Sequence, residues 1–258
     1  MPAQHSGYVS SQVINTFLEK LRPLGFGRFY YCILPDDLPS FSESIGRNSK
    51  LFFGNPSGLK KMRFAVSSDD KILQFRDEFL YRFSRADCSF LYSRPSSCIH
   101  RHPFYFPVRR IDERRRRSVE HLKAKHNIGG AATFYHKVAG REGWMGIFHL
   151  FSEQEEVEIE RNVQSRHQEL VALLEEYSSI FNYLAHLDIN PIANFGLLSP
   201  TCIKILTMVA EGDSSEEIGK KLFLTERGVN YHLDRAREIL GARNRTNLVS
   251  KAYQTGLL

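Results

Sequence analysis

The sequence predicts an α+β protein in which a mixed N-terminal block, with a modest antiparallel sheet, precedes a small bundle of four helices. Three observations support this division. Aromatic and β-branched runs such as "RFYYCIL", 28–34, alternate with helical patterns early in the chain. Two more such runs, 129–138 and 143–152, flank a Gly-containing turn and predict a hairpin. Residues 198–258 show only helical periodicity.

The first elements are defined by apolar spacing and by the residues that interrupt it. The first helix begins behind Ser10, and Gly25 ends it. The strand after this helix stops at Pro35, because proline cannot donate to a strand ladder. The expected elements are a helix at 10–24, strands at 28–34 and 62–66 with a further short candidate at 51–53, and helices at 69–83 and 111–126.

A long amphipathic helix is expected over 152–187, because apolar residues recur there every three or four positions. The next segment carries Pro191, two asparagines and Gly196, which interrupt helices. We therefore expect three parts: a sensory and dimerisation domain at 1–187, a linker at 188–197 and a helical domain at 198–258.

Composition limits the classes of function. The 258 residues carry a net charge of +6, a mild bias towards polyanions such as nucleic acid. No apolar run is long enough to span a membrane, and no secretory signal precedes the first helix, so the cytoplasm is the expected location. The four cysteines, Cys32, Cys88, Cys98 and Cys202, lack the spacing of a zinc site or a disulfide framework. We expect neither a metal nor a cofactor.

The C-terminal block contains two short helices joined by a tight turn. Ser199 is expected to cap a first helix with Pro200 at its first position. In "SSEEIGKKLFLTERGVNYHL", 214–233, a second helix is followed by a third that Thr225 caps. The third helix exposes polar residues near its start, as a helix does when it enters the major groove of DNA. A fourth helix is expected at about 245–255.

These features predict a DNA-binding surface. Lysines and arginines around the second and fourth helices are expected to hold phosphates, whereas Arg227, Asn230, Tyr231 and Arg235 are the candidates for contacts with bases. The residues expected to contact DNA are Lys220, Lys221, Thr225, Arg227, Asn230, Tyr231, His232, Arg235, Arg243, Arg245 and Thr246.

The same residues resemble a known family. Leu198-Ser199-Pro200, Ala210-Glu211-Gly212, Thr225-Glu226-Arg227 and Asn244-Arg245-Thr246 resemble the LuxR-type DNA-binding domain of bacterial transcription regulators. Two positions depart from that pattern: Cys202 stands where the family usually has Glu, and Gly228 replaces a Thr in the recognition helix. The alternative is a helical bundle that binds no DNA.

The N-terminal block is similar to the autoinducer-binding domain of quorum-sensing LuxR proteins. The segment 126–152, "HNIGGAATFYHKVAGREGWMGIFHLFS", resembles the family's Gly-Ile-x-x-Gly segment and its hairpin. The resemblance implies an α/β/α sandwich around an antiparallel sheet, with an acyl-homoserine-lactone-like signal between sheet and helices. A receiver domain is disfavoured, because βαβ alternation and a phosphorylatable Asp at a strand end are missing.

The same resemblance implies a ligand site. Asp87 is the best match to the Asp of the family's Asp-Pro pair, although Cys88 follows it instead of proline. The only tryptophan, Trp144, lies in the hairpin, away from the positions of the family's tryptophans. The residues expected to line the site are Phe79, Tyr81, Asp87, Phe104, Phe106 and Thr133. Alternatively, these aromatics form ordinary core.

Together these features predict a DNA-binding transcription regulator of the quorum-sensing type. We expect it to form a homodimer, to bind double-stranded DNA at an imperfect palindrome and to respond to a small amphipathic signal. If it is an activator, RNA polymerase is a further partner. One rival is a ligand-independent regulator whose N-terminal domain serves dimerisation or binds a protein. Another is an enzyme, but His100, His102 and His149 are accompanied by no nucleophile motif or metal spacing. We expect no catalysis.

Overall fold

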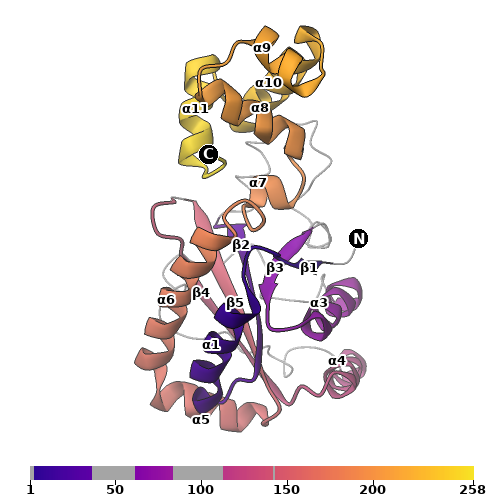
Figure 1. Cartoon of the computed structure of the whole chain (residues 1–258). Coiled ribbons are helices and arrows are strands. Elements are labelled where there is room, and N and C mark those ends of the chain that lie inside the picture. The colour runs from indigo at the N-terminus through magenta and orange to yellow at the C-terminus, as the bar shows by residue number, and fades with distance from the viewer. Residues whose placement is uncertain (1–2, 37–61, 84–112, 142) are drawn as a thin grey trace.

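The computed structural model describes residues 3–36, 62–83, 113–141 and 143–258. A sheet lies between two helical layers, and a helical C-terminal part stands beyond one end of the sheet (Figure 1). The predicted α+β fold class is therefore confirmed. In chain order the elements are β1 Gln4–His5, α1 Ser11–Leu21, the 3₁₀ helix η1 Arg22–Leu24, β2 Arg28–Pro35, β3 Phe64–Ser67, α3 Asp70–Phe83, α4 Glu113–Lys125, β4 Gly130–Lys137, β5 Trp144–Ser152, α5 Glu156–Ser165, α6 His167–Leu184, α7 Pro191–Asn194, α8 Pro200–Ala210, α9 Ser215–Leu222, α10 Glu226–Leu240 and α11 Arg245–Gln254.

The described strands form one five-stranded sheet in the order β1-β3-β2-β5-β4. The pairs β3/β2, β2/β5 and β5/β4 are antiparallel, as predicted. The predicted hairpin is β4 and β5, whose register places Phe134 opposite Phe148. The edge strand β1, which the sequence did not suggest, pairs with β3 in parallel. The candidate strand at 51–53 lies outside the described residues.

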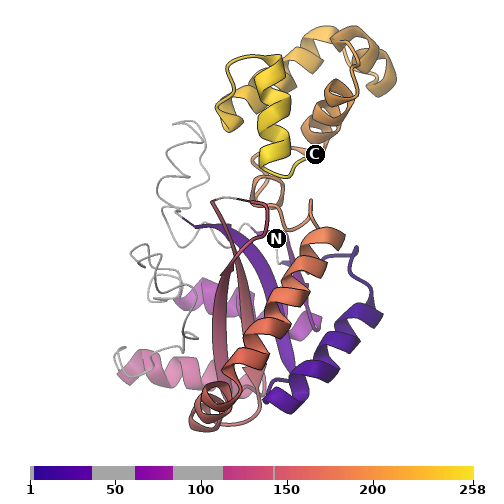
Figure 2. The ribbon, with the colours of Figure 1, turned by 90° about the vertical axis from the view of Figure 1, so that its left-hand side faces the viewer.

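Helices α1 and α6 cover one face of the sheet (Figure 2). An aromatic cluster joins the two layers: the ring of Phe17 lies edge-on to Phe29, with centroids 4.7 Å apart, and stacks on Tyr177 at 4.3 Å. Phe181 of α6 stacks on Phe29 at 5.8 Å. These rings are buried, and close ring packing of this kind stabilises the sheet–helix contact beyond simple burial of area.

A buried polar cluster also lies between the sheet and α6. The hydroxyl of Tyr31 shares a hydrogen bond with Ser178 Oγ at 3.0 Å and donates to Asn182 Oδ1 at 3.3 Å. His136 Nε2 is also hydrogen-bonded to Ser178 Oγ. Burial raises the pKa of the Tyr31 phenol well above its usual value, so the group remains a neutral donor. The cluster ties β2 and β4 to α6.

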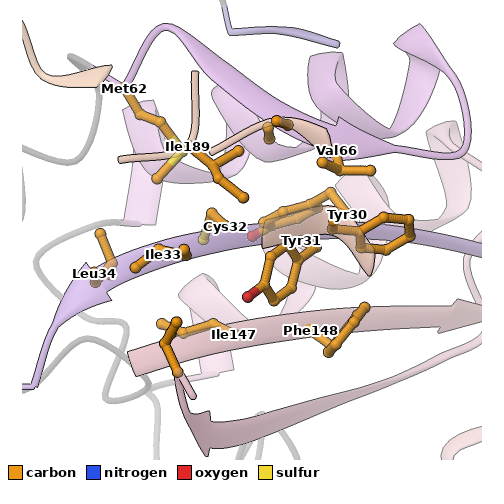
Figure 3. Close-up of a cluster of buried hydrophobic side chains, with 14 of the residues drawn as sticks. Tyr30, Tyr31, Cys32, Ile33, Leu34, Met62, Val66, Ile147, Phe148 and Ile189 are labelled. Atoms are coloured by element: carbon orange, nitrogen blue, oxygen red, sulfur yellow. The ribbon is translucent and has the colours of Figure 1, made fainter. Parts of the chain in front are cut away.

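Helices α3 and α4 lie on the opposite face of the sheet (Figure 2). Phe75 of α3 contacts Phe151 of β5 edge-on at 5.5 Å. The basic helix α4 buries only a few apolar side chains, among them Leu122, and Lys125 is tethered to Glu78 of α3 at 2.7 Å. Figure 3 shows the centre of the core, where the side chains of β2 lie among those of neighbouring elements.

The prediction of one long helix over 152–187 is wrong. Strand β5 extends to Ser152, and Arg166, with φ −123° and ψ 27°, separates α5 from α6. The Arg166 side chain is fixed at this corner, because it donates to the carbonyl of Pro23 at 2.7 Å and pairs with Glu169. The apolar period continues through the break, since both helices contribute buried residues to the same core.

The predicted linker, 188–197, includes α7 and is largely buried. Asn190 caps α7 by accepting a hydrogen bond from Ile192 N at 3.0 Å. Asn194 pairs with the start of β3: its side chain accepts from the backbone N–H of Phe64 at 2.8 Å and donates to the same residue's carbonyl at 2.8 Å. Ile189, from the same segment, belongs to the buried cluster of Figure 3. The segment is thus packed onto the sheet.

Two further contacts join the C-terminal helices to the rest of the chain. The side-chain amide of Asn190 donates to the carbonyls of Thr255 and Gly256, at 2.7 and 3.2 Å. The guanidinium of Arg141, in the β4–β5 turn, lies so close to Gly256 that an added Cβ there would be 2.7 Å from its Nε atom. These contacts hold the end of α11 against the hairpin and the linker.

No helix in the described part of the chain is long and apolar enough to cross a membrane.

Gly146 leaves the space that the Tyr31 and His136 side chains occupy, so a side chain at this position should destabilise the fold. A Cβ at this position would lie 2.7 Å from Tyr31 Oη and closer still to the His136 ring. We expect Gly146→Ala to lower the free energy of unfolding by about 1–3 kcal/mol, as overpacking of a core does. Denaturant unfolding measures this, with Gly27→Ala as control, because a Cβ at Gly27 meets nothing within 4 Å. Equal effects of the two substitutions would contradict the packing described here.

Candidate nucleic-acid interface

Helix α9 begins with two reciprocal hydrogen bonds. Ser214 Oγ accepts from the backbone N–H of Glu217 at 3.2 Å, and the Glu217 carboxylate accepts from Ser214 N at 2.8 Å. This capping box satisfies two donors that a helix start otherwise leaves unpaired. The hydrogen bonds from Ser214 hold the pKa of the Glu217 carboxyl below its usual value. The predicted start of this helix is confirmed.

The turn between α9 and α10 is tight. Gly219 permits it, because a Cβ at this position would lie 2.7 Å from the carbonyl oxygen of Leu224. Phe223, the residue after α9, adopts a left-handed conformation, with φ 55° and ψ 41°. Thr225 then caps α10 by accepting a hydrogen bond from Gly228 N at 3.1 Å. The two helices are thereby joined as a helix-turn-helix.

Helix α10 has one buried and one exposed side. Val229, Leu233 and Ala236 face the other helices and are buried. The opposite side exposes Arg227 and Asn230, together with Tyr231, whose side chain is 69% exposed. The N-terminal half of α10 therefore presents hydrogen-bond donors and acceptors to solvent, as entry into a major groove requires.

The residues expected to contact DNA all lie on α9, on α10 with its capping residue, or around the start of α11. Among them, His232 and Arg235 are partly buried, and the others are exposed. The exposed ones are Lys220, Lys221, Thr225, Arg227, Asn230, Tyr231, Arg243, Arg245 and Thr246.

Asn230 also has a structural contact that the sequence did not indicate. Its Oδ1 atom accepts a hydrogen bond from Ser215 Oγ of α9 at 2.8 Å. Arg245 donates to the same Ser215 oxygen at 3.2 Å and to the carbonyl of Asp213 at 2.6 Å. These bonds fix α10 and α11 to the start of α9, although Asn230 as a whole is exposed.

The basic side chains of α9 are paired with carboxylates on the surface. Lys220 lies 2.7 Å from Glu216, and Lys221 lies 2.7 Å from Asp213. These hydrogen bonds raise the pKa of both lysines, which therefore stay charged. Exposed pairs of this kind contribute little to stability, so both lysines are able to exchange their partners for phosphates.

Cys202 occupies the interior of the C-terminal helices. Its thiol donates to the carbonyl of His232 at 3.3 Å and so links α8 to α10. Burial raises the pKa of this thiol to about 11, so the group stays protonated at neutral pH. A neutral donor thus stands where the LuxR-type pattern usually carries a carboxylate.

Of the residues expected to line a ligand site, three lie in the described part of the chain. Thr133 lies on β4, and Phe79 packs against the core from α3. Tyr81, on α3, is 77% exposed, so it does not line a buried site. Asp87, Phe104 and Phe106 lie outside the described residues.

Two side chains that sequence reasoning had not placed in this site join Thr133. Thr133 Oγ1 is hydrogen-bonded to His149 Nδ1 of β5 at 3.0 Å, and the His149 ring stacks on Tyr30 of β2, with centroids 4.3 Å apart. The three residues form a row across the sheet, on the side of α3. The alternation of "GIFHLF" in β5 places His149 on this side, but its partners follow only from the strand register.

A comparison with protein families matches residues 197–252 to the model described as "Bacterial regulatory proteins, luxR family". Over 66 residues the chain is 36% identical to the putative HTH-type transcriptional regulators Mb0914c of Mycobacterium bovis and MT0914 of Mycobacterium tuberculosis. That stretch is 26% of this chain but only 8% of each relative. The chain therefore matches only a small part of the length of these relatives.

Two solved structures superpose on most of the chain. One is SdiA of Escherichia coli, with a TM-score of 0.41 and 15% identity, over 96% of this chain and 92% of that one. The other is SdiA in complex with octanoyl-rac-glycerol, with a TM-score of 0.42 and 16% identity, over 96% and 89% of the two chains. Both TM-scores are low, so neither likeness assigns a ligand or a binding site to this chain.

Two glycines of the helix-turn-helix should respond to alanine to different extents. Gly219→Ala is expected to lower the free energy of unfolding by about 1–3 kcal/mol, because the new Cβ meets the Leu224 carbonyl. Gly228→Ala should lower it less, because a gain in helix propensity of about 1 kcal/mol opposes the displacement of the capping Thr225 Oγ1, which lies 3.3 Å from the new Cβ. Thermal unfolding of both variants checks this. Equal losses, or a larger loss for Gly228→Ala, would contradict the geometry of the turn.

Proposed function

We propose that this chain, whose residues 197–252 form a LuxR-type helix-turn-helix domain, is a DNA-binding transcription regulator acting in the cytoplasm. The observation that carries the proposal is the polarity of α10. One side of that helix is buried against α8 and α9, and its N-terminal half exposes Arg227, Asn230 and Tyr231. A helix with this arrangement, presented by a preceding short helix, fits the major groove.

The exposed residues divide into two roles. Lys220, Lys221, Arg243 and Arg245 would hold phosphates and set the position of the helix on the duplex. Arg227, Asn230, Tyr231 and Arg235 would contact base edges, since guanidinium and amide groups match the donor and acceptor patterns of guanine and adenine. Thr225, His232 and Thr246 would support contacts at the edges of this surface.

The regulator would act as a homodimer on an imperfect palindrome. A single helix reads only a few base pairs, and pairing two copies places two recognition helices about one turn of the duplex apart. In this proposal residues 1–187 serve sensing and dimerisation, 188–197 link them to DNA binding at 198–258, and RNA polymerase is a partner if the protein activates transcription.

A small amphipathic signal, such as an acyl-homoserine lactone, is the finer part of the proposal. The polar row of Tyr30, Thr133 and His149 supports it, because it places hydrogen-bonding groups on a largely apolar sheet face beside α3. Ligand-independent dimerisation is the second candidate. The exposure of Tyr81 favours that candidate, since a pocket residue would be shielded from water.

Asn230→Ala tests contact with bases. We expect its affinity for a cognate duplex, recovered by selection from random DNA with the full chain, to fall about 5- to 150-fold. Affinity for unrelated DNA should change little, because phosphate contacts remain. Fluorescence anisotropy at fixed salt measures both.

Ser215→Ala is the control for the structural contact, because it removes the Ser215–Asn230 hydrogen bond, together with the one from Arg245, but keeps the Asn230 side chain. It should leave the preference for the cognate duplex intact. If both variants lose specificity equally, Asn230 acts by positioning α10 and not by contact with a base. If the wild-type chain selects no sequence, the proposed function itself is wrong.

The signal is tested by extraction. Full-length protein made in a host without an acyl-lactone synthase should unfold at a lower temperature than protein made with acyl-homoserine lactone in the medium, because a ligand that binds only the folded state stabilises it. Mass spectrometry of the denatured second sample should recover the lactone. Equal melting temperatures, with no small molecule recovered, would favour the ligand-independent regulator.

A further inference from the structure

Phe223 combines an unfavourable backbone with an unburied side chain. Its φ of 55° and ψ of 41° lie in the left-handed region, where the Cβ atom of an L-residue crowds the following carbonyl oxygen. Its side chain is 96% exposed, the highest value among the exposed large hydrophobic residues of the described chain. The folded chain therefore gains no packing from the ring.

Other left-handed positions in the described residues carry the residue types that tolerate them. Apart from Phe223, the only such non-glycine residue in that part of the chain is Asn127, and asparagine adopts this conformation readily. The Asn127 amide also donates to Glu153 at 2.7 Å. Phe223 has neither advantage, so nothing in the isolated fold offsets the strain of its backbone conformation.

The position of Phe223 indicates what could offset this strain. It lies two residues before Thr225, the cap of α10, and the exposed N-terminal half of that helix follows directly. If this half enters the major groove, the turn before it lies at the edge of the groove, above deoxyriboses and base methyl groups. Lys220 and Lys221, three and two residues earlier, add positive charge suited to the flanking phosphates.

We infer that Phe223 is a specificity-determining residue that packs its ring against the 5-methyl group and deoxyribose of a thymine at the edge of each half-site. This inference rests on the proposed function. Apolar contact with the thymine methyl is an established form of base discrimination in the major groove, and phenylalanine can supply it. Burial of the exposed ring against DNA would offset the left-handed backbone.

The test compares the full wild-type chain with Phe223→Asn, which retains a residue suited to the left-handed region and should leave the fold intact. Selection from random duplexes should yield a half-site with a thymine at one edge position for the wild type, and no preference there for the variant. Replacing that thymine by deoxyuridine removes only the methyl group. We expect this to weaken wild-type binding about threefold to tenfold and to leave the variant unchanged.

Tyr253→Asn is the control, because Tyr253 is also an exposed aromatic, 58% accessible, but lies near the end of α11. Figure 1 places that end next to the sheet-containing part and away from α9 and α10. The control should keep the thymine preference and its sensitivity to deoxyuridine.

Three results would overturn the inference. The first is a variant that selects the same thymine and responds to deoxyuridine like the wild type. The second is a variant that binds DNA unchanged but loses transcription with purified RNA polymerase, in which case the ring contacts a protein. The third is a wild-type chain that selects no sequence, which removes the proposed function and this inference with it, whereas the first two results leave DNA binding standing.

Discussion

The geometry of the candidate interface depends on the close approach of Gly219 to the carbonyl of Leu224. No side chain fits between them, since a Cβ would lie 2.7 Å from the Leu224 oxygen. This approach allows α10 to begin shortly after α9 ends, with Thr225 as its cap. The angle between the two helices then determines which side of α10 is buried and which side is available to a groove.

The hydrogen bonds around Ser215 complete this arrangement. Ser215 binds both Asn230 and Arg245, so one hydroxyl connects α9, α10 and α11. Cys202 contributes a further link from α8 to the carbonyl of His232. The exposed donors of α10 are therefore presented by a firmly braced helix, and a preorganised surface loses less entropy on binding.

Local signals made much of this part predictable from sequence. Ser199 and Thr225 cap their helices as expected, because a capping hydrogen bond spans only three residues. The hairpin of β4 and β5 was also predictable, because its turn residues and the strands beside them are neighbours in the sequence. The break at Arg166 was not predicted, because Arg166 contacts Pro23, 143 positions away, and sequence spacing gives no sign of such a contact. Strand β1 was missed as well, since its two residues carry no periodic pattern.

In the candidate sites, too, local features were predictable from sequence and long-range contacts were not. Exposure of Arg227, Asn230 and Tyr231 follows from helical periodicity, whereas the bond between Asn230 and Ser215 arises only when two helices meet. On the sheet, Thr133 was named from a resemblance, but its partners His149 and Tyr30 follow from strand register. The exposure of Tyr81 reflects the rotation of α3, which sequence spacing alone does not determine.

The central claim is that α10 enters the major groove at two half-sites. Dimethyl sulfate footprinting of the full chain on a selected duplex tests it directly, because the reagent methylates guanine N7 in that groove. We expect two protected clusters, about 10 base pairs apart from centre to centre. Binding without any protection of guanine N7 would contradict entry of α10 into the groove.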